Sequence, residues 1–450
     1  MTLPPKPQSR PEKVSLWQYG RLFRRDILSA QPERLYRAWM AEFRTPFFRS
    51  YLANDPALVR LVLKERPSDF PKSDRVGEGL RPLLGRSVFL SNGELWERQR
   101  RIIDPAFEGG RLRDSFAAIS DAAAAAARRL SERREREIEV EAEASHAAAD
   151  VIFRTLFSIP IDHDIAAKTY HAFRRYQRSQ PILNLAAFLP LPRWMPRGFR
   201  HTTRASASEL RVLIRQLTAN RQKSIEVGEA PEDLATKIMT TADPQTGERF
   251  DVDEMVDQVA IFFLAGHETS ASTLAWALYL LATHPKWQEQ VAAEAMEADL
   301  SGFASLSKLR ATRDVFRETL RLYPPVPMMV RENAKDETLR ERFVRKKAQI
   351  VLSPWHLHRH TRLWESPDSF DPARWQTENG QSCAREAFIP FSAGPRVCPG
   401  AGFAMMEGVL MLAHILKALR VEPANRPPPV PVAHLTVRAK DGIWLRIVRR

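Results

Sequence analysis

Cysteine is scarce in this chain of 450 residues, which contains two, Cys383 and Cys398. Two thiols cannot build a disulfide framework, so small secreted folds held by several disulfides are excluded. Such cysteine usage fits a reducing compartment, in which a free thiol stays available for chemistry. The fold must instead depend on an apolar core, and the hydrophobic content of 44% is ample for one.

The N-terminus lacks a long apolar run. Residues 1–25 are rich in Pro, Arg and Lys, which predicts neither a signal peptide nor a transmembrane anchor. We therefore expect a cytoplasmic protein. We also expect residues 1–30 to be a loosely ordered arm and residues 31–450 to form a single, mainly helical α+β domain.

Acidic residues are outnumbered, since 68 Lys and Arg against 54 Asp and Glu give a formal net charge of +14. This balance suits nucleic acid, an anionic membrane surface or an acidic protein partner. The arginines are dispersed and no helix-turn-helix, zinc-finger or RNP-like pattern is present, which argues against nucleic acid. Gly400-Ala-Gly402 is not a dinucleotide fingerprint, because no strand–glycine–helix unit surrounds it.

Cys398 lies in the segment Phe391-Ser-Ala-Gly394-Pro-Arg396-Val-Cys398-Pro-Gly400. The apolar stretch 403–419 predicts a helix, and Pro399 suits a first helical position. Cys398 would then face a helix N-terminus, where unpaired N–H groups favour an anion and lower the pKa of a thiol. The alternatives are a buried structural cysteine, a nucleophile and a metal ligand, and a thiolate is what a haem iron can bind.

The pattern Phe-x-x-Gly-x-Arg-x-Cys-x-Gly resembles the haem-ligand signature of the cytochrome P450 family of haem-thiolate monooxygenases, in its soluble bacterial form. The resemblance covers almost all of residues 30–450. It implies the cytochrome P450 fold, with a large helical lobe and a small β-rich lobe. It also implies haem b (iron protoporphyrin IX) as the cofactor, Cys398 as the axial iron ligand, and haem contacts from Phe391, Gly394 and Gly400.

A long helix is predicted from a capping box at Asp251-Val-Asp-Glu254 to about Thr283, because no proline interrupts this stretch. Its apolar middle is broken by Ala265-Gly-His-Glu268-Thr269-Ser, and Gly266 and Thr269 should weaken the helix locally. The segment resembles the oxygen-activation motif of the family. The resemblance implies that Ala265 contacts the haem, that Thr269 hydrogen-bonds dioxygen, and that Glu268 gates proton delivery. A structural salt bridge is the alternative role for Glu268, and His267 is expected to be a core histidine.

The haem propionates have candidate partners in three segments. Trp96 and Arg100 are four residues apart and share a helix face. By resemblance these two residues, together with Arg331 and Arg396, hold the propionates. An exposed arginine on a surface helix is the alternative for Arg100.

Two further groups have structural interpretations. Glu318 and Arg321 lie at i and i+3 on a predicted helix, and with Arg374 they resemble the family's Glu-Arg-Arg network, which positions the cysteine loop. His356, His358 and His360 alternate and could form a metal site on a strand. We take the alternative that they belong to the scaffold, because Trp364 and Pro367 follow them in the family's pattern.

The substrate pocket implied by family position is apolar, which suggests a hydrophobic substrate such as a fatty acid, a terpenoid or an aromatic compound. Its expected members are Phe89, Ile261, Leu264, Val326, Met329 and Leu435. The apolar segment 181–196, between two predicted helices, resembles the lid over the family's substrate channel. An ordinary packed loop is the alternative for that segment.

Smaller elements are predicted from local signals: a short helix at 33–43, a strand at 46–52, a helix at 55–64 capped by Asp55, a long loop over 66–92, and a strand at 326–330 that Arg331 ends. Residues 420–450 should form short strands.

The implied reaction is reductive cleavage of O2, with one oxygen atom inserted into an organic substrate. The chain ends soon after the haem domain, so we expect that no reductase is fused to it and that electrons come from a separate acidic ferredoxin and its NAD(P)H-dependent reductase. We also expect a monomer. Candidate docking residues near the cysteine loop are Arg98, Arg101, Arg111 and Arg113, for which solvated surface is the alternative. A peroxygenase using H2O2 and a non-enzymatic haem sensor are rival functions, and the pair Glu268–Thr269 argues against both.

Overall fold

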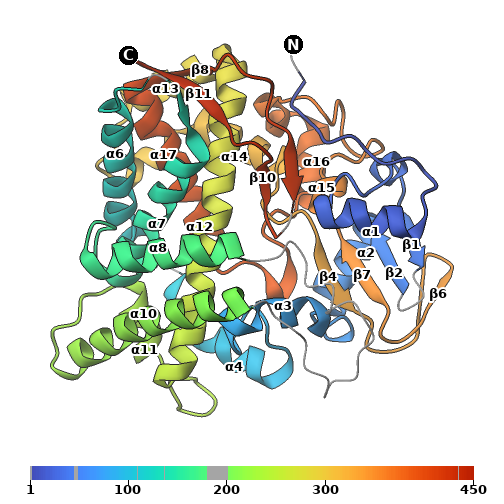
Figure 1. The fold of residues 1–450 in the computed structure, drawn as a ribbon, viewed down its shortest axis with the longest axis horizontal. Helices are drawn as coiled ribbons and strands as arrows, with labels where there is room; N and C mark the ends of the chain where they lie inside the picture. The colour runs from blue at the N-terminus through green and yellow to red at the C-terminus, as the bar shows by residue number, and fades with distance from the viewer. Residues whose placement is uncertain (1–2, 45–48, 109, 136, 180–200, 434) are drawn as a thin grey trace.

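A large helical lobe and a small β-rich lobe make up the molecule, as the sequence predicts (Figure 1). The computed structural model describes residues 3–44, 49–108, 110–135, 137–179, 201–433 and 435–450. The α-helices are α1 (Leu16–Arg25), α2 (Pro56–Arg60), α3 (Asp74–Leu84), α4 (Gly93–Ile103), α5 (Arg111–Asp114), α6 (Phe116–Ser131), α7 (Val140–Phe157), α8 (Asp164–Ser179), α10 (His201–Glu226), α11 (Leu234–Thr240), α12 (Val252–Thr283), α13 (Pro285–Glu297), α14 (Arg310–Leu322), α15 (Pro354–Leu357), α16 (Glu378–Glu386) and α17 (Ala401–Ala418). Short 3-10 segments are η1 (Glu33–Tyr36), η3 (Pro67–Asp69), η4 (Asp104–Ala106), η5 (Phe303–Ser307), η6 (Pro372–Gln376) and η7 (Gly394–Arg396), and one π segment is η2 (Leu61–Glu65).

The largest sheet has the strand order β1-β2-β7-β4. The β2–β7 pair is parallel, and the β1–β2 and β7–β4 pairs are antiparallel. A three-stranded sheet has the order β3-β11-β8, and two hairpins pair β9 with β10 and β5 with β6. The strands are β1 (Met40–Arg44), β2 (Arg49–Ala53), β3 (Glu137–Glu139), β4 (Met329–Glu332), β5 (Glu337–Leu339), β6 (Arg342–Val344), β7 (Gln349–Leu352), β8 (Leu419–Pro423), β9 (Pro431–Ala433), β10 (Val437–Ala439) and β11 (Trp444–Arg449).

The long helix α12 runs through the helical lobe and joins its two cores (Figure 1). The predicted capping box is present: Asp251 accepts from the N–H of Glu254 at 2.7 Å, and the Glu254 carboxylate accepts from the N–H of Asp251. The first half of α12 packs with α7, α8 and α10, and the second half packs with α6, α14 and α17. Burial on nearly all sides explains why its sequence is apolar almost throughout.

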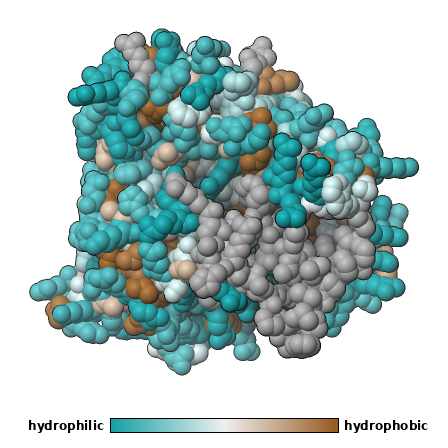
Figure 2. Space-filling view, viewed as in Figure 1, coloured by the Kyte–Doolittle hydropathy of each residue, from teal (hydrophilic) through white to brown (hydrophobic). Residues whose placement is uncertain are grey.

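Helix α17, which follows the cysteine loop, is the other apolar helix of the core. Among the described residues it is the one helix whose length and composition would suit a membrane span. It packs instead against α6, α12, α13 and α14 inside the lobe, which accounts for its composition. The outer surface in the view of Figure 2 is mainly hydrophilic, with scattered hydrophobic side chains.

Several local predictions differ from the structure. The loop predicted over 66–92 contains α3, whose apolar side chains Leu80, Leu83 and Leu84 are buried. Gly77 and Pro82 disfavour a helix, which is why the sequence predicted a loop here. The helix predicted at 33–43 is the short η1 followed by β1, because pairing with β2 fixes residues 40–44 as a strand. The strand predicted at 326–330 corresponds to β4, which begins three residues later, at Met329, and continues through Arg331 to Glu332.

The helix predicted at 55–64 begins as expected, with Asp55 capping α2, and then continues as the π segment η2. The arm expected at 1–30 contains α1, and Lys6 forms an ion pair with Asp368 at 3.0 Å, so this segment has definite contacts with the body. The lid predicted at 181–196 lies outside the described residues.

Candidate functional site

The cysteine loop is closed by backbone hydrogen bonds. The N–H of Cys398 donates to the carbonyl of Phe391 at 2.9 Å, and α17 begins at Ala401, two residues later than predicted from Pro399. Gly394 has a φ of +67°, and a Cβ there would lie 1.8 Å from the carbonyl oxygen of Leu63 in η2. Only glycine suits both the backbone conformation and this close approach. The loop is thereby held against η2.

Cys398 is an exposed residue, although protein atoms crowd around its thiol. This crowding raises the pKa of the Cys398 thiol, although the N–H of Gly400 and the charges of Arg100 and Lys72 act to lower it. The expectation that the helix N-terminus lowers this pKa is therefore wrong for the chain alone, because desolvation outweighs it. A thiol that coordinates a metal ion is deprotonated outright. The charge of the ion would therefore stabilise the thiolate, which the helix N-terminus alone does not achieve.

Four cations surround the approach to Cys398. Arg396 lies with its guanidinium carbon 4.0 Å from the Trp96 ring centroid, and Arg100 donates to the carbonyl of Val397 at 2.8 Å. Lys72 contacts β4 through an isolated β-bridge to Arg331. The pKa of Lys72 is lowered well below its usual value, first by burial and then by the charges of Arg331, Arg396 and Arg100. Burial lowers the pKa of Arg331 to about 10. Burial and the charges of Arg331 and Arg100 together lower the pKa of Arg396 to about 10 as well.

These cations have too few anions around them. Asp104 pairs with Arg100 at 2.8 Å, but no acidic side chain of the described residues forms an ion pair with Lys72, Arg331 or Arg396. The guanidinium of Arg331 donates to the carbonyl of Val330 at 3.3 Å, and no other side-chain hydrogen bond of Arg331 is found among the described residues. Arg331 is buried and Lys72 and Arg396 are half-buried, and cations withdrawn from water need such partners. The two propionates of a haem would supply them, so the residues present fit the haem that the sequence implies.

Trp96, Arg100, Arg331 and Arg396, predicted from three separate segments, are thus brought together. Lys72 was missed, because no motif surrounds it and a single lysine after a proline carries no signal. Its place beside Arg331 depends on pairing between segments more than 250 residues apart in the chain.

Glu268 and Thr269, the acid and the alcohol of the predicted oxygen-activation motif, lie in the middle of α12. Thr269 donates its hydroxyl to the carbonyl of Ala265 at 2.5 Å, and Ala265 is exposed although most neighbouring positions of the helix are buried. The helix itself continues without a break from residue 252 to 283, so the predicted local disruption at Gly266 is not observed. Gly266 has a packing role instead, since a Cβ there would lie 2.7 Å from Cδ1 of Ile152 in α7.

Glu268 is buried and paired. Its carboxylate accepts from Arg438 at 2.9 Å and from Thr436 at 3.4 Å, and Gln177 also donates to it. The salt bridge considered as an alternative role is therefore present. Next to it, His267 is a core histidine as expected: Nε2 lies 2.7 Å from the Ser145 hydroxyl, and burial lowers the pKa of His267 to about 3.

The Glu318–Arg321–Arg374 network is formed at the end of α14. Arg321 donates to both carboxylate oxygens of Glu318 at 2.8 Å, and Arg374 donates to the same carboxylate at 2.9 Å. The remaining N–H groups donate to backbone carbonyls of residues 358–369. The network thus connects α14 with the segment that leads to the cysteine loop.

The three alternating histidines are buried scaffold residues. Nε2 of His358 accepts from the N–H of Ile389 at 2.9 Å, and Nδ1 of His356 lies 2.8 Å from the Ser353 hydroxyl. Burial lowers the pKa of both imidazoles to about 3, so both are neutral. No group of three His, Cys, Asp or Glu side chains within the described ranges could hold a metal ion.

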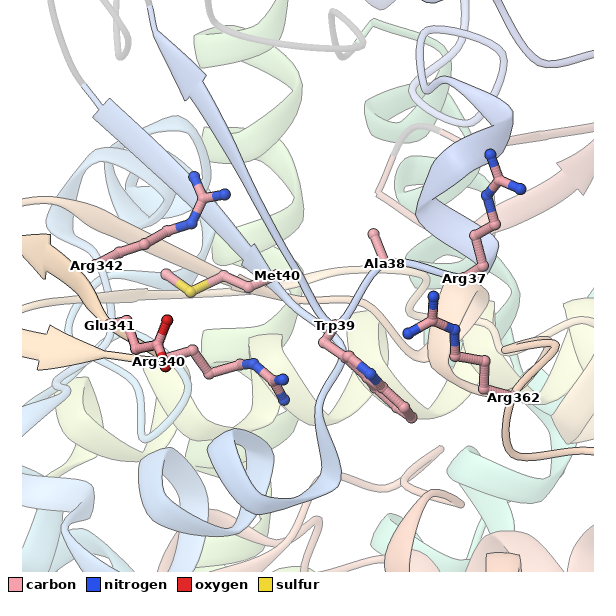
Figure 3. A pocket seen from close by; sticks show the side chains of 8 residues that line it. All are labelled: Arg37, Ala38, Trp39, Met40, Arg340, Glu341, Arg342 and Arg362. Atoms are coloured by element: carbon pink, nitrogen blue, oxygen red, sulfur yellow. The ribbon is translucent and has the colours of Figure 1, made fainter.

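The predicted pocket residues divide into two groups. Phe89 and Leu435 are 39% and 38% exposed, and Val326 and Met329 are half-buried, so these four have surface available to a ligand. Ile261 and Leu264 are buried in the helical core. A separate shallow cavity of about 390 Å³ lies on the small lobe, where Trp39 lies between Arg340 and Arg362 (Figure 3). Its lining contains none of the residues described above.

Known proteins match this chain over nearly its whole length. The family model described as Cytochrome P450 matches residues 4–445. Cyclooctat-9-en-7-ol 5-monooxygenase from Streptomyces melanosporofaciens is 35% identical over 393 residues, which cover 85% of this chain and 83% of that protein. Cyclooctatin synthase from the same organism is 31% identical, with 83% and 81% covered. Cytokinin hydroxylase from Arabidopsis thaliana is 28% identical, with 91% and 82% covered.

The fold is also found among solved structures. The crystal structure of the cytochrome P450DA heme domain superposes with a TM-score of 0.81 at 24% sequence identity, covering 100% of this chain and 98% of that chain. The predicted fold class is therefore confirmed.

Proposed function

Because the chain belongs to the cytochrome P450 family, and is therefore an oxidoreductase whose cofactor is a haem, we propose that it inserts one oxygen atom from O2 into a hydrophobic substrate. The observation that carries this proposal is the convergence of an accessible thiol at Cys398, four cations with too few anions, and an accessible Ala265–Thr269 turn on α12. The haem, when bound, supplies the redox chemistry that cleaves O2.

The chain's own residues have distinct roles in this proposal. Cys398 would supply the thiolate that holds the haem iron, and Gly394 keeps its loop against η2. Lys72, Arg100, Arg331 and Arg396 would hold the two propionates through charge-assisted hydrogen bonds, and Trp96 orients Arg396. The Glu318 network keeps the segment before the loop in place.

Thr269 and Glu268 serve the oxygen chemistry. Thr269 can turn its hydroxyl from the Ala265 carbonyl toward dioxygen and hold a hydrogen bond there. Glu268 lies beside it as a carboxylate compensated by Arg438, which suits the role of a fixed acceptor that orients water and side-chain donors. Each turnover consumes two protons and two electrons and releases one water with the hydroxylated product.

We infer an apolar, cyclic substrate, mainly hydrocarbon, from two supports. The accessible residues at the expected pocket positions, Phe89, Val326, Met329 and Leu435, are all apolar. One relative is named for the oxidation of cyclooctat-9-en-7-ol, a cyclic alkenol.

We propose an acidic ferredoxin as the electron donor, because the net charge of +14 favours encounter with an acidic protein. The docking residues predicted from the sequence need revision. Arg98 pairs with Glu254 at 2.7 Å, Arg101 with Asp243 at 2.6 Å, and Arg111 with Asp114 at 3.3 Å, so their charges are partly neutralised. Arg113, exposed on α5 and packed on Phe303, remains the strongest of the four. A cytoplasmic monomer with residues 31–450 as one haem domain completes the proposal.

The first test is the ferrous–CO spectrum of the purified protein and of Cys398→Ser. We expect the red-shifted Soret band of thiolate ligation in the wild type and its loss in the variant. Turnover is then compared with NADPH plus a surrogate ferredoxin and reductase, and with H2O2 alone. Product with the redox partners supports the monooxygenase; product with peroxide alone would make the protein a peroxygenase, and no product with a panel of cyclic terpenoids would contradict the substrate class.

A further inference from the structure

The shallow cavity on the small lobe brings together arginines from three segments of the chain. Arg340 and Arg342 come from the β5–β6 hairpin. Arg37 precedes β1, and Arg362 follows α15. Among the eight described residues that line the cavity, Glu341 is the one acid. The cavity therefore has an excess of positive charge that neither the haem site nor the proposed reaction uses.

Trp39 orients two of these arginines. Its ring centroid lies 5.9 Å from the guanidinium carbon of Arg340 and 5.7 Å from that of Arg362. The ring is itself stacked on His360, with 4.3 Å between the two centroids. Figure 3 shows Arg340 pointing toward Trp39 from one side, with Arg37 and Arg362 on the other side. A guanidinium over an aromatic ring keeps the N–H groups at its edge available, so these arginines are oriented in advance for an anion.

Two of the four arginines have acidic partners. Arg340 forms an ion pair with Asp55. Arg342 lies 3.8 Å from Glu42, a longer contact, and Glu42 also accepts from Arg44 at 2.8 Å. The positive charge of the hairpin side of the cavity is therefore only partly neutralised.

Arg37 and Arg362 have no such partners. Both residues are exposed, and among the residues that the structure describes neither guanidinium forms an ion pair or donates a hydrogen bond. The neighbouring His360 is neutral at pH 7, because burial lowers its pKa to about 4. Two guanidinium groups at one cavity thus keep all their donors available for a ligand.

The turn that presents Arg340 has an unusual sequence for its shape. Arg340 and Glu341 alone connect β5 with β6, and both have a positive φ, +44° and +64°. A two-residue turn of this kind favours Asn, Asp or Gly, because longer side chains are strained in the left-handed region. Strained positions of this kind cluster at binding sites. Two long charged side chains at the turn therefore favour a role in binding.

The cations that line the cavity are all arginines, and this determines the ligand chemistry. The planar fork of arginine pairs with both oxygens of a carboxylate or a phosphate. A carboxylate has one charge and two oxygens, which a single fork satisfies. A phosphate group has three strong acceptor oxygens and a charge of about −1.5 to −2 at pH 7, so it can engage several arginines at once.

We propose that this cavity is a binding site for a phosphate-bearing ligand, held by Arg37, Arg362 and the turn at Arg340. The phosphate belongs either to a soluble molecule or to a lipid headgroup, and the chemistry at the guanidinium groups is the same for both sources. The inference goes beyond the proposed monooxygenase function and does not depend on it, since the cavity contains no residue assigned to the haem or to the oxygen chemistry.

Nonspecific attraction of anions is the alternative meaning of this surface. The chain has a formal net charge of +14, and the hairpin continues into exposed Arg345, Lys346 and Lys347. Such a surface attracts any anion weakly. A specific site differs because its affinity depends on Arg37 and Arg362, and not on the total charge of the protein.

Isothermal titration calorimetry of the haem-loaded protein with pyrophosphate, at an ionic strength of about 0.15 M, tests the site. We expect one pyrophosphate per chain in the wild type. The double variant Arg37→Gln, Arg362→Gln should bind it about tenfold more weakly or worse, because charge-assisted hydrogen bonds are removed.

The matched control is the double variant Arg128→Gln, Arg134→Gln. Both residues are exposed in the helical lobe, form no ion pair among the described residues, and contribute the same net charge as Arg37 and Arg362. The control should keep the affinity of the wild type to within about twofold, since exposed charges beyond a Debye length are screened. Equal losses in the two double variants, or no pyrophosphate binding in the wild type, would overturn the proposal.

Glu341→Gln provides a test with the opposite sign. It removes the acid that lines the cavity, so pyrophosphate should bind about two- to fivefold more tightly. Weaker binding in this variant would contradict the position assigned to the ligand. Haem content and the CO spectrum show that each variant is folded, and we expect both to be unchanged because the cavity is separate from the cysteine loop.

Two further probes identify the ligand class. Sedimentation is compared for vesicles of phosphatidylcholine with phosphatidylglycerol and for vesicles of phosphatidylcholine alone. Vesicle binding that pyrophosphate displaces, and that the variant without Arg37 and Arg362 lacks, would place the phosphate on a lipid. Pyrophosphate binding without vesicle binding would place it on a soluble molecule. Malonate, a dicarboxylate, is the last probe: if it binds as tightly as pyrophosphate, the phosphate class is wrong and the cavity is a site for carboxylates of an acidic peptide.

Discussion

The guanidinium of Arg396 lies over the ring of Trp96, with 4.0 Å between its central carbon and the ring centroid. Arg396 also donates to the carbonyl of Ser91 at 3.2 Å and to Asn92 Oδ1 at 2.9 Å. Residues 300 positions apart in the chain are thus joined where α4 begins and the cysteine loop ends. The stacking fixes the direction in which Arg396 presents its remaining donors.

Trp96→Leu should therefore accelerate haem loss, by about tenfold, because a cation–π contact with a desolvated arginine is worth roughly 1–2 kcal/mol. Haem transfer to an excess of apomyoglobin measures the rate. Trp444→Leu is the matched control, since Trp444 stacks under Arg426 at 3.8 Å on β11, away from the cysteine loop, and should leave the rate unchanged. Equal rates for the two variants would contradict the role of Trp96.

Lys72→Met should act in opposite directions on the two forms of the protein. Without haem, it removes one of four mutually repelling cations and should raise the free energy of unfolding by on the order of 1 kcal/mol. With haem, it removes a charge-assisted partner of a propionate and should speed haem loss roughly tenfold or more. Urea unfolding of the apoprotein and haem transfer measure the two effects. A loss of stability in both forms would mean that Lys72 is an ordinary structural residue.

Glu318→Gln should destabilise the protein by about 3–5 kcal/mol, because Arg321 and Arg374 are then left buried without a counter-charge. The midpoint of denaturant unfolding reports the loss. Glu289→Gln is the control, since the Glu289–Arg450 pair is exposed and contributes less than about 1 kcal/mol. Similar midpoints for the two variants would show that the network is not stabilising.

Gly394→Ala should abolish the thiolate CO spectrum, because the new Cβ would lie 1.8 Å from the Leu63 carbonyl and the backbone has a positive φ. Gly228→Ala separates the two causes. Gly228 also has a positive φ, +75°, but nothing lies within 4 Å of its Cβ position, so that variant should lose only about 1 kcal/mol of stability and keep the spectrum. A normal spectrum in Gly394→Ala would mean that η2 can move away from the loop.

The stability of the protein should fall between about pH 4.5 and pH 8 through Glu407. In the folded chain its pKa is raised to about 8, so the folded state holds a proton that the unfolded state has already released. Below the pKa of the unfolded state, Glu407 is protonated in both states and does not change the free energy of unfolding. As the pH rises above that value, the free energy of unfolding falls by up to a few kcal/mol, since each pKa unit corresponds to about 1.4 kcal/mol. Glu407→Gln should flatten this part of the pH profile, measured by urea unfolding. An unchanged slope would show that Glu407 is ionised in the folded protein.

The cysteine loop and the long helix could be predicted from the sequence because their signals are contiguous. Four fixed residues, Phe391, Gly394, Arg396 and Gly400, surround Cys398, and a capping box and an uninterrupted apolar stretch define α12. Local elements with weak signals were missed: Gly77 and Pro82 concealed α3, and pairing with β2 overrode the helical pattern before Met40. The role of Gly266 was misjudged for the same reason, since it depends on the approach of Ile152 from another helix.

The sequence by itself determined the family, the thiol, the four-residue spacing of Trp96 and Arg100, and the acid–alcohol pair, because each is written in one short segment. The tertiary structure alone decided which charges meet. It placed Lys72 beside Arg331, Arg438 against Glu268, and Glu407 against Ser270. Burial and pairing fix the protonation of a side chain, and both depend on neighbours that lie tens to hundreds of residues away along the chain.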